Sequence, residues 1–166
     1  MTASASDPDA LRQALEAAGR RCTPQRRAVY DHLRRAGDHP TAEEVYQLVR
    51  ASIPNISLAT VYKALEALVA SGAASRLPAG DGLSSASNSA RYDARGDHHY
   101  HLRCLRSGAV LDLSTPYDPD LITKIDPNLR RSLGVRGFTV TGYRLELVGY
   151  FQDESDPAGI PEATGE

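Results

Sequence analysis

Residues 57–72 read SLATVYKALEALVASG, and this stretch decides the fold. It predicts a helix that begins after Ser57, a good N-cap residue, and ends before Gly72. Apolar residues recur along one face of this helix, at Val61, Leu65, Leu68 and Val69. Polar side chains lie on the other face or near its start, at Thr60, Tyr62 and Lys63.

Three shorter helices are expected before it. The first spans about residues 9–18. The second begins at Pro24 behind the N-cap Thr23, and Gly37 stops it. The third opens with the capping box Thr41-Ala-Glu-Glu44 and ends before Ile53.

Two strand-like segments, Ala73–Leu77 and Ala90–Tyr92, follow the fourth helix. The Gly- and Ser-rich stretch 78–89 between them is interpreted as the mobile tip of a hairpin, with an inter-domain linker as the alternative. Helices followed by such a hairpin are the order of a winged helix-turn-helix. The helix after Ser57 would then enter the major groove of DNA.

From Asp97 the apolar period changes to two, which predicts a strand. A second strand is expected at Ala109–Leu113, a helix at Asp118–Leu133 interrupted at Pro127, and a third strand at Gly137–Phe151. A sheet this small gains stability by pairing with a second copy, which favours a homodimer.

The fold class is therefore α+β, an N-terminal winged helix-turn-helix followed by a small α/β dimerisation domain. We expect the DNA-binding domain over residues 9–92 and the metal-binding dimerisation domain over 93–152. Residues 1–8 and 153–166 are expected to be disordered.

The bulk composition is that of a globular protein, with 166 residues, 41% of them hydrophobic, and a formal net charge of −2. No apolar run approaches the roughly 20 residues of a membrane span, and the start of the chain lacks the pattern of a secretory signal. We expect a cytoplasmic location, no membrane partner, and no disulfide between Cys22 and Cys104. A basic cluster that could contact DNA or simply be solvated comprises Arg20, Arg21, Arg26, Arg27, Arg34 and Arg35.

Histidines are concentrated in His98-His-Tyr-His101. Alternate residues of a strand project from the same face, so His99 and His101 can converge on one ion. Asp112 is expected on the adjacent strand, within reach of that face. The alternative is an exposed polar edge strand without a ligand.

Five motifs in order and spacing resemble the ferric uptake regulator (Fur) family over roughly residues 10–152. They are His39-Pro-Thr-Ala-Glu-Glu-Val-Tyr46, Ile56-Ser-Leu-Ala-Thr-Val-Tyr62, Arg91-Tyr-Asp93, His98-His-Tyr-His-Leu-Arg-Cys104 and Val110-Leu-Asp112.

The resemblance implies a homodimeric repressor that binds a palindromic DNA operator and is controlled by a regulatory metal. The ligands it implies are His39, Asp93, His99, His101 and Asp112. Such a donor set suits Fe(II) or Mn(II), with Zn(II) also able to bind. An Asp at position 112 is similar to the peroxide-responsive PerR branch, in which His39 and His101 would be oxidised; a regulator of iron or manganese uptake is the alternative.

The chain departs from the family where most members hold a structural zinc with two Cys-x-x-Cys pairs. Here the first position reads Cys104-Leu-Arg-Ser107 and the second reads Phe151-Gln-Asp-Glu154. We therefore expect no structural zinc and a buried, apolar Cys104. We also expect a further metal site of the family to be lost, because Tyr100 and Tyr143 occupy its positions. His98 is then an unassigned candidate ligand.

On the DNA side, Tyr62 resembles the family's base-contacting tyrosine, and Ser57, Thr60 and Lys63 should share its face. Arg20, Arg26 and Arg27 could contact phosphates, whereas Arg34 and Arg35 are interpreted as solvent-exposed.

Two other classes of function are alternatives to a regulator. His99, His101 and Asp112 could form the facial triad of a non-haem metal enzyme, but no substrate pocket is evident from the sequence. A metal-free protein-interaction module is the third class. We expect a regulator and not an enzyme.

Overall fold

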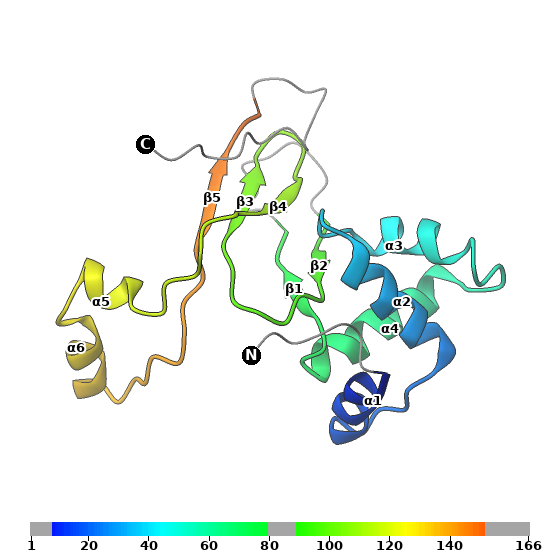
Figure 1. Cartoon of the computed structure of the whole chain (residues 1–166), viewed down its shortest axis with the longest axis horizontal. Helices are drawn as coiled ribbons and strands as arrows, with labels where there is room; N and C mark the ends of the chain where they lie inside the picture. Colours follow the sequence, from blue (N-terminus) through cyan, green and yellow to red (C-terminus); the bar gives the residue numbers. More distant parts are fainter. Residues whose placement is uncertain (1–7, 80–88, 152–166) are drawn as a thin grey trace.

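A computed structural model of the chain describes residues 8–79 and 89–151. Figure 1 shows the helices of the N-terminal part on one side, the strands at the centre and the short helices of the C-terminal part on the far side. The helices are α1 (Pro8–Ala17), α2 (Pro24–Arg35), α3 (Ala42–Val49), α4 (Leu58–Ala70), α5 (Leu121–Ile125) and α6 (Leu129–Val135). The strands are β1 (Ser75–Leu77), β2 (Arg91–Asp93), β3 (His101–Cys104), β4 (Val110–Asp112) and β5 (Glu146–Gly149). The α+β fold class is confirmed.

The main hydrophobic core lies among α1 to α4, where the predicted apolar faces meet. Val61, Leu65 and Leu68 of α4 are fully buried. The three predicted N-caps form as expected, because Thr23, Thr41 and Ser57 each accept a hydrogen bond from the first turn of their helix. The capping box of α3 is complete, since Glu44 also accepts from the backbone N–H of Thr41 at 2.7 Å.

The β1–β2 hairpin packs beside these helices. It is antiparallel and pairs Ser75 with Asp93 and Leu77 with Arg91. Strand β1 is shorter than predicted, because it begins at Ser75 and not at Ala73. Strand β2 is shifted by one residue and ends at Asp93. Residues 80–88, which hold most of the predicted wing tip, lie outside the described part of the chain, as do residues 1–7 and 153–166 of the segments predicted to be disordered. The last residue of the predicted disordered segment 1–8, Pro8, is instead the first residue of α1.

The second sheet has the strand order β4-β3-β5, with β3 antiparallel to β4 and parallel to β5. The prediction that His99 lies on the same strand as His101 is wrong, because β3 begins only at His101, opposite Asp112. The predicted strand over 137–151 is also too long. Its partner β3 has four residues, and these pair only with Glu146–Gly149.

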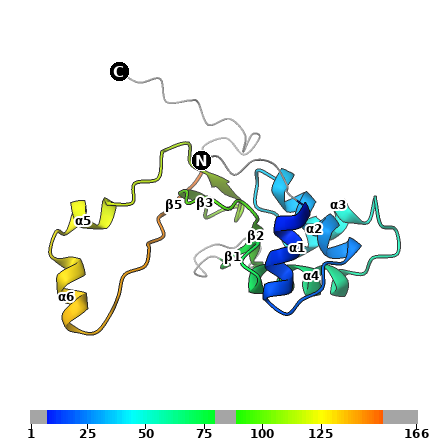
Figure 2. The same ribbon diagram turned by 60° about the horizontal axis from the view of Figure 1, so that its bottom comes forward.

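The predicted helix over 118–133 is divided in two, with the interruption at Pro127 as expected. It also begins later than predicted, because Asp118 accepts a hydrogen bond from the backbone N–H of Asp120 at 3.0 Å and forms a turn. Figures 1 and 2 agree that α5 and α6 lie away from the rest of the chain. Neither helix contains a buried residue.

None of the helices in the described ranges is both long and apolar enough to cross a membrane.

Candidate metal centre

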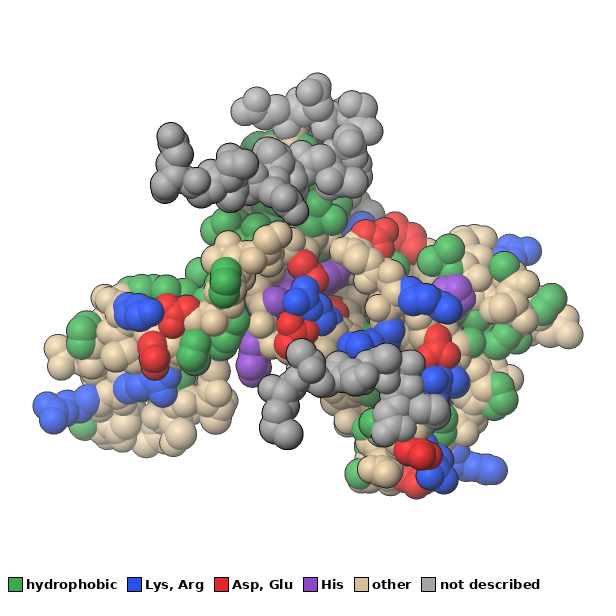
Figure 3. Space-filling model, viewed as in Figure 1, with side chains coloured by type: hydrophobic (Ala, Val, Ile, Leu, Met, Phe, Trp, Pro, Cys, Tyr) green, Lys and Arg blue, Asp and Glu red, His purple; other side chains and the backbone are tan. Residues whose placement is uncertain are grey.

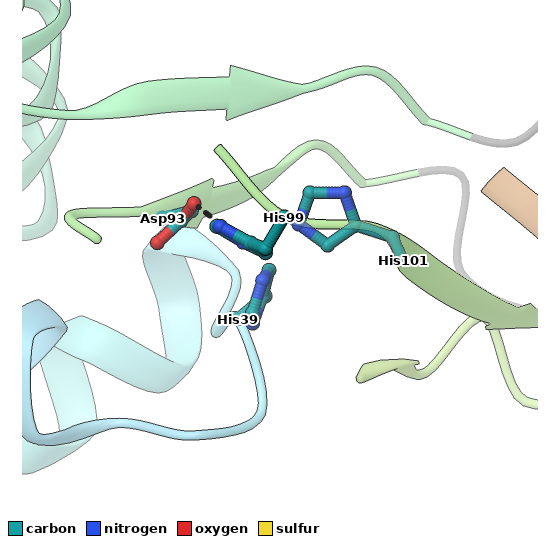
Figure 4. A group of neighbouring side chains, drawn as sticks. All are labelled: His39, Asp93, His99 and His101. Carbon is teal, nitrogen blue, oxygen red and sulfur yellow. Dashed lines mark ion pairs between the residues drawn. The ribbon is translucent and has the colours of Figure 1, made fainter. Parts of the chain in front are cut away.

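Four residues with metal-ligating side chains meet between the helical part and the β4-β3-β5 sheet (Figure 4). His39 comes from the loop before α3, Asp93 from the end of β2, His99 from the segment before β3 and His101 from the first position of β3. Each offers one nitrogen or oxygen atom, and these atoms all lie within 4.8 Å of one another. The four predicted ligands are therefore brought together.

The fifth predicted ligand, Asp112 on β4, contacts the same imidazoles. Its Oδ1 lies 2.9 Å from Nε2 of His39, 3.1 Å from Nε2 of His99 and 3.8 Å from Nε2 of His101. Asp93 approaches from the other side, with Oδ2 at 3.4 Å from Nε2 of His99. Three imidazoles and two carboxylates thus face one point.

The atoms at this point are buried but lack hydrogen-bond partners. In the described part of the chain, this holds for Nε2 of His39, His99 and His101 and for Oδ1 of Asp112. Buried polar atoms are normally paired, because leaving one unpaired costs about 1–3 kcal/mol. Imidazole nitrogens and a carboxylate oxygen that converge in this way fit a bound cation, so these residues satisfy the requirements of a metal site.

The orientation of His99 is fixed by a bond on the other side of its ring. Its Nδ1 lies 2.9 Å from the backbone oxygen of Asp97, which can only accept. The proton of a neutral His99 is therefore on Nδ1, and the lone pair of Nε2 points into the site. This is the usual arrangement around a metal-binding histidine.

Arg95, which the sequence reasoning missed, holds both carboxylates. Its Nη1 donates to Oδ2 of Asp112 at 2.7 Å, and its backbone N–H donates to Oδ1 of Asp93 at 2.6 Å. The same guanidinium pairs with Asp97 at 2.8 Å. Asp112 therefore presents Oδ1 to the imidazoles and Oδ2 to the arginine.

The protonation states favour metal binding. Burial would by itself raise the pKa of Asp112, but the contacts with His39 and Arg95 outweigh it and lower that pKa. Burial, together with the neighbouring His39 and His99, lowers the pKa of His101 to about 4. The carboxylate is thus charged and the imidazole of His101 neutral at physiological pH, the forms that coordinate metals.

The site is open to solvent on one side. A cleft of about 520 Å³ is lined by residues that include Asp93, His99 and His101. In Figure 3 the histidines at the centre of the face lie behind acidic and basic side chains. The cleft therefore reaches the edge of the site, while the atoms that converge at its centre are buried.

The predicted DNA-contacting residues of α4 lie at its exposed beginning. Tyr62 is 39% exposed, and its hydroxyl donates to Oε1 of Glu43 on α3 at 2.7 Å. Lys63 is exposed. Ser57 and Thr60 are engaged locally, because their hydroxyls lie 2.8 Å apart and Ser57 caps the helix.

The basic residues before and on α2 differ in their surroundings. Arg20 is exposed. Arg26 donates to the backbone oxygen of Arg21, and Arg27 pairs with Asp31 at 2.9 Å. The interpretation of Arg34 as merely solvent-exposed is incomplete, because it donates to the backbone oxygen of Ala94 at 3.1 Å.

Cys104 is buried at the end of β3, as predicted, but its surroundings are not wholly apolar. Its sulfur lies 3.5 Å from the backbone nitrogen of Ser107. Burial alone would raise the pKa of this thiol, but a hydrogen bond with the side chain of Ser107, followed by backbone N–H groups that include its own, lowers the pKa to about 7.

The residues that replace the family's further metal site form an aromatic cluster. The hydroxyls of Tyr100 and Tyr143 lie 2.7 Å apart, and Tyr117 stacks on Tyr143 with ring centroids 5.1 Å apart. His98 stacks on Tyr117 with centroids 5.0 Å apart, outside the group of converging ligands.

Comparison with known proteins gives a consistent match. Residues 17–148 match the model of the ferric uptake regulator family. The peroxide-responsive repressor PerR of Staphylococcus saprophyticus is 35% identical over 138 residues, which cover 83% of this chain and 84% of that protein.

Two solved structures are also similar. A zinc-bound manganese uptake regulator is 29% identical with a TM-score of 0.57, and the match covers 85% of this chain and 98% of that one. The ferric uptake regulator Fur of Vibrio cholerae is 27% identical with a TM-score of 0.62, and the match covers 84% of this chain and 98% of that one.

The resemblance inferred from five short motifs thus extends over most of the chain. The alternative of a non-haem metal enzyme is wrong, because the regulators of this family are not enzymes. The chain belongs to the ferric uptake regulator family of metal-dependent transcriptional regulators.

Proposed function

We propose that the chain is a cytoplasmic repressor that binds a palindromic operator as a homodimer and senses peroxide through Fe(II) or Mn(II). The regulatory site would comprise His39, Asp93, His99, His101 and Asp112. The observation that carries the proposal is the convergence of three unpaired imidazole nitrogens from both sides of the junction between the helices and the β4-β3-β5 sheet.

The position of the site explains how metal could control DNA binding. His39 and Asp93 belong to the predicted DNA-binding domain over 9–92 or to its boundary, whereas His101 and Asp112 lie on the sheet. Ligands that are shared in this way favour one angle between the two parts when an ion is bound. That angle then sets the geometry of the helices that would meet DNA.

The donor set supports Fe(II) or Mn(II), since imidazoles combined with carboxylates suit both ions. Zn(II) remains an alternative occupant, and a solved relative is a zinc-bound manganese uptake regulator. Bound Fe(II) would activate hydrogen peroxide. One oxygen of the peroxide would be inserted into the imidazole of His39 or His101, which is a two-electron oxidation of that ring, and the other oxygen would leave as water. The cleft lined by His99 and His101 would bring a small oxidant to the edge of the site.

The far end of the chain supports a homodimer. Helices as short as α5 and α6 are not stable without tertiary contacts, yet they bury no residue within the described chain. Strand β5 lies at an edge of its sheet. Large apolar side chains are exposed along these elements, at Ile125, Val135, Phe138, Leu147, Val148 and Tyr150. A second copy would cover them.

We assign DNA contact to the exposed beginning of α4. Tyr62 and Lys63 would reach the base edges, with Ser57 and Thr60 beside them at the helix start. Arg20, Arg26 and Arg27 would contact phosphates, which fix register without reading sequence. No structural zinc is proposed, since the chain has only Cys22 and Cys104.

The test begins with the DNA. Duplexes that bind the Mn(II)-loaded chain are selected from a random pool, and the affinity of the best duplex is measured for the apo, Mn(II) and Fe(II) forms. Peroxide is then added without oxygen present, and affinity is measured again. Trypsin separates residues 36–50, which contain His39, from residues 96–103, which contain His101, so fragmentation of each peptide locates any added oxygen.

We expect both metals to raise the affinity, and peroxide to abolish it only in the Fe(II) form, with one oxygen on His39 or His101. If the Fe(II) form keeps its affinity and gains no oxygen, the chain responds to iron or manganese supply and not to peroxide. His99→Ala should lose metal-dependent DNA binding, whereas the control His98→Ala should retain it. A metal-independent DNA affinity would overturn the proposal altogether.

A further inference from the structure

Two arginines outside the metal site, both little exposed, connect the β1–β2 hairpin to the β4-β3-β5 sheet. Arg91 on β2 donates from Nε to the backbone oxygen of Gly108, between β3 and β4, at 2.8 Å. Arg103 on β3 donates from Nη2 to the backbone oxygen of Pro78, directly after β1, at 3.0 Å. Their side chains are only 11% and 6% exposed. Hydrogen bonds that are shielded from water in this way are strengthened.

In one bond the donor belongs to the hairpin, and in the other the donor belongs to the sheet. Both bonds lie at the same end of the hairpin. The register pairs Leu77 with Arg91 there and Ser75 with Asp93 at the other end. The hairpin is therefore connected to the sheet at both ends. The arginine hydrogen bonds at one end need no ion, whereas Asp93 at the other end belongs to the candidate metal centre.

The charges of both arginines are compensated locally. Arg103 pairs with Glu146 on β5 through Nε at 3.1 Å and Nη2 at 3.0 Å. Arg91 pairs with Glu44 of α3 at 3.3 Å. Neither guanidinium is a free cation in need of a ligand, so their function is structural within the junction.

Arg91 also supports the loop that presents His39. Its Nη1 donates to the backbone oxygen of His39 at 3.0 Å. His39 has a φ of 49°, in the left-handed region that non-glycine residues rarely adopt. Next to it, the N–H of Tyr92 donates to the backbone oxygen of Pro40 at 3.0 Å. Strand β2 and its arginine thus fix the backbone of one metal ligand.

We propose that Arg91 and Arg103 form an inter-domain clamp, which sets the angle between the helical part and the sheet before any metal binds. They act as positioning residues for the metal centre. A chain whose two parts are already aligned binds metal more tightly, because the apparent dissociation constant equals the intrinsic one divided by the fraction of aligned chains. The regulatory meaning of the clamp rests on the proposed function, but the clamp itself is a property of the metal-free chain.

The first experiment measures the alignment without metal or DNA. Spin labels are attached at Glu66→Cys on α4 and Thr115→Cys after β4 in a chain that also carries Cys22→Ser. The labelled chain is diluted with unlabelled chain, so that distances within one chain dominate in the pulsed EPR measurement. Because neither metal nor DNA is present, the result does not depend on whether the proposed repressor function is right.

We expect a narrow distance distribution in the metal-free parent and a broad one in Arg91→Ala. The paired change Arg103→Met with Glu146→Met removes the second bond without leaving a buried charge unpaired, and it should broaden the distribution too. Arg76→Ala, an exposed residue of the same hairpin, is the matched control and should stay narrow. Circular dichroism verifies that each variant is folded.

The second experiment titrates each unlabelled variant with Mn(II). Loss of the clamp should weaken Mn(II) binding about three- to tenfold, whereas Arg76→Ala should bind like the parent. The clamp is refuted if the metal-free parent is as broad as the variants, or if Arg91→Ala stays as narrow as Arg76→Ala. If the variants have broader distance distributions but bind Mn(II) as tightly as the parent, the positioning role is refuted.

Discussion

Single residues that bond to the candidate ligands from outside the metal centre help to fix the orientation of those ligands. Arg95 bonds to the outer oxygen of Asp112 and, through its backbone N–H, to Asp93. It lies between the two carboxylates and fixes the oxygen that each one turns inward. Partners of this kind typically contribute ten- to a hundredfold to metal affinity, by rough magnitude.

Replacing Arg95 by Gln should therefore weaken Mn(II) binding about tenfold, because Asp112 is then free to rotate. Isothermal titration of the metal-free chain with Mn(II) measures the effect, and Arg130→Gln on the exposed face of α6 is the control. An increase in affinity would mean that repulsion between the guanidinium and the ion outweighs the orientation of Asp112, and would refute this role.

His101 should make the stability of the metal-free chain depend on pH. Its pKa is lowered from 6.5 to about 4 by burial and by the neighbouring His39 and His99. Between these values the unfolded chain takes up a proton and the folded chain does not. The contribution is therefore complete above pH 6.5 and is lost progressively as the pH falls toward 4.

Urea titrations between these pH values would measure that loss as a decrease in the free energy of unfolding. His101→Gln should flatten the dependence on pH, whereas the exposed His98→Gln should leave it unchanged. Equal slopes in the parent and in His101→Gln would show that other groups cause the dependence.

Among the secondary-structure elements, the helices were the most predictable from sequence. Helices α2, α3 and α4 each have a capping side chain and an apolar stripe, and these local signals agree with how they pack. Strands were less predictable, because their length depends on a partner that is distant in the chain. The segment 137–151 alternates as a strand should, yet only Glu146–Gly149 finds a partner in β3.

The contact between α4 and α3 gives a prediction for DNA binding. Tyr62 donates to Glu43, and this bond holds the phenol at the exposed start of α4. Tyr62→Phe should lower the affinity for the selected duplex about fivefold, equivalent to ~1 kcal/mol, because it removes the hydrogen bond with Glu43 and the polar contact that we propose with DNA.

Fluorescence anisotropy with the Mn(II)-loaded protein measures this change. Mn(II) affinity itself should not move, because Tyr62 is not part of the metal centre. Tyr46→Phe on α3, a half-buried tyrosine beside Arg50, is the control. Equal DNA affinities of Tyr62→Phe and the parent would exclude the hydroxyl from recognition.

At the scale of the whole molecule, the exposed edge strand β5 predicts that two copies of the chain associate through this edge. Val148 is 59% exposed on this edge strand. Val148→Asp should lower the dimer association constant at least tenfold, because a carboxylate would be buried in an apolar interface. Sedimentation equilibrium measures the constant. Leu48→Asp on α3, where the native side chain is 51% exposed, should leave it unchanged.

The metal ligands were more predictable than the residues that hold them in place. The five candidate ligands belong to motifs that can be read in order along the chain, and the structure brings their side chains together. Arg91, Arg95 and Arg103 were missed because their partners include backbone atoms and acids from other segments. Backbone carbonyls such as those of Pro78 and Gly108 carry no sequence signal, so these contacts become visible only in three dimensions.

The wide separation of the ligands along the chain has a consequence for synthesis. His39 leaves the ribosome long before Asp112, and the imidazoles meet only after the sheet has folded onto the helices. A nascent chain that ends before β4 would lack Asp112 and the strand that pairs with β3 at His101. We expect such a chain to bind Mn(II) more weakly than the whole chain, because the remaining candidate ligands are not held in place.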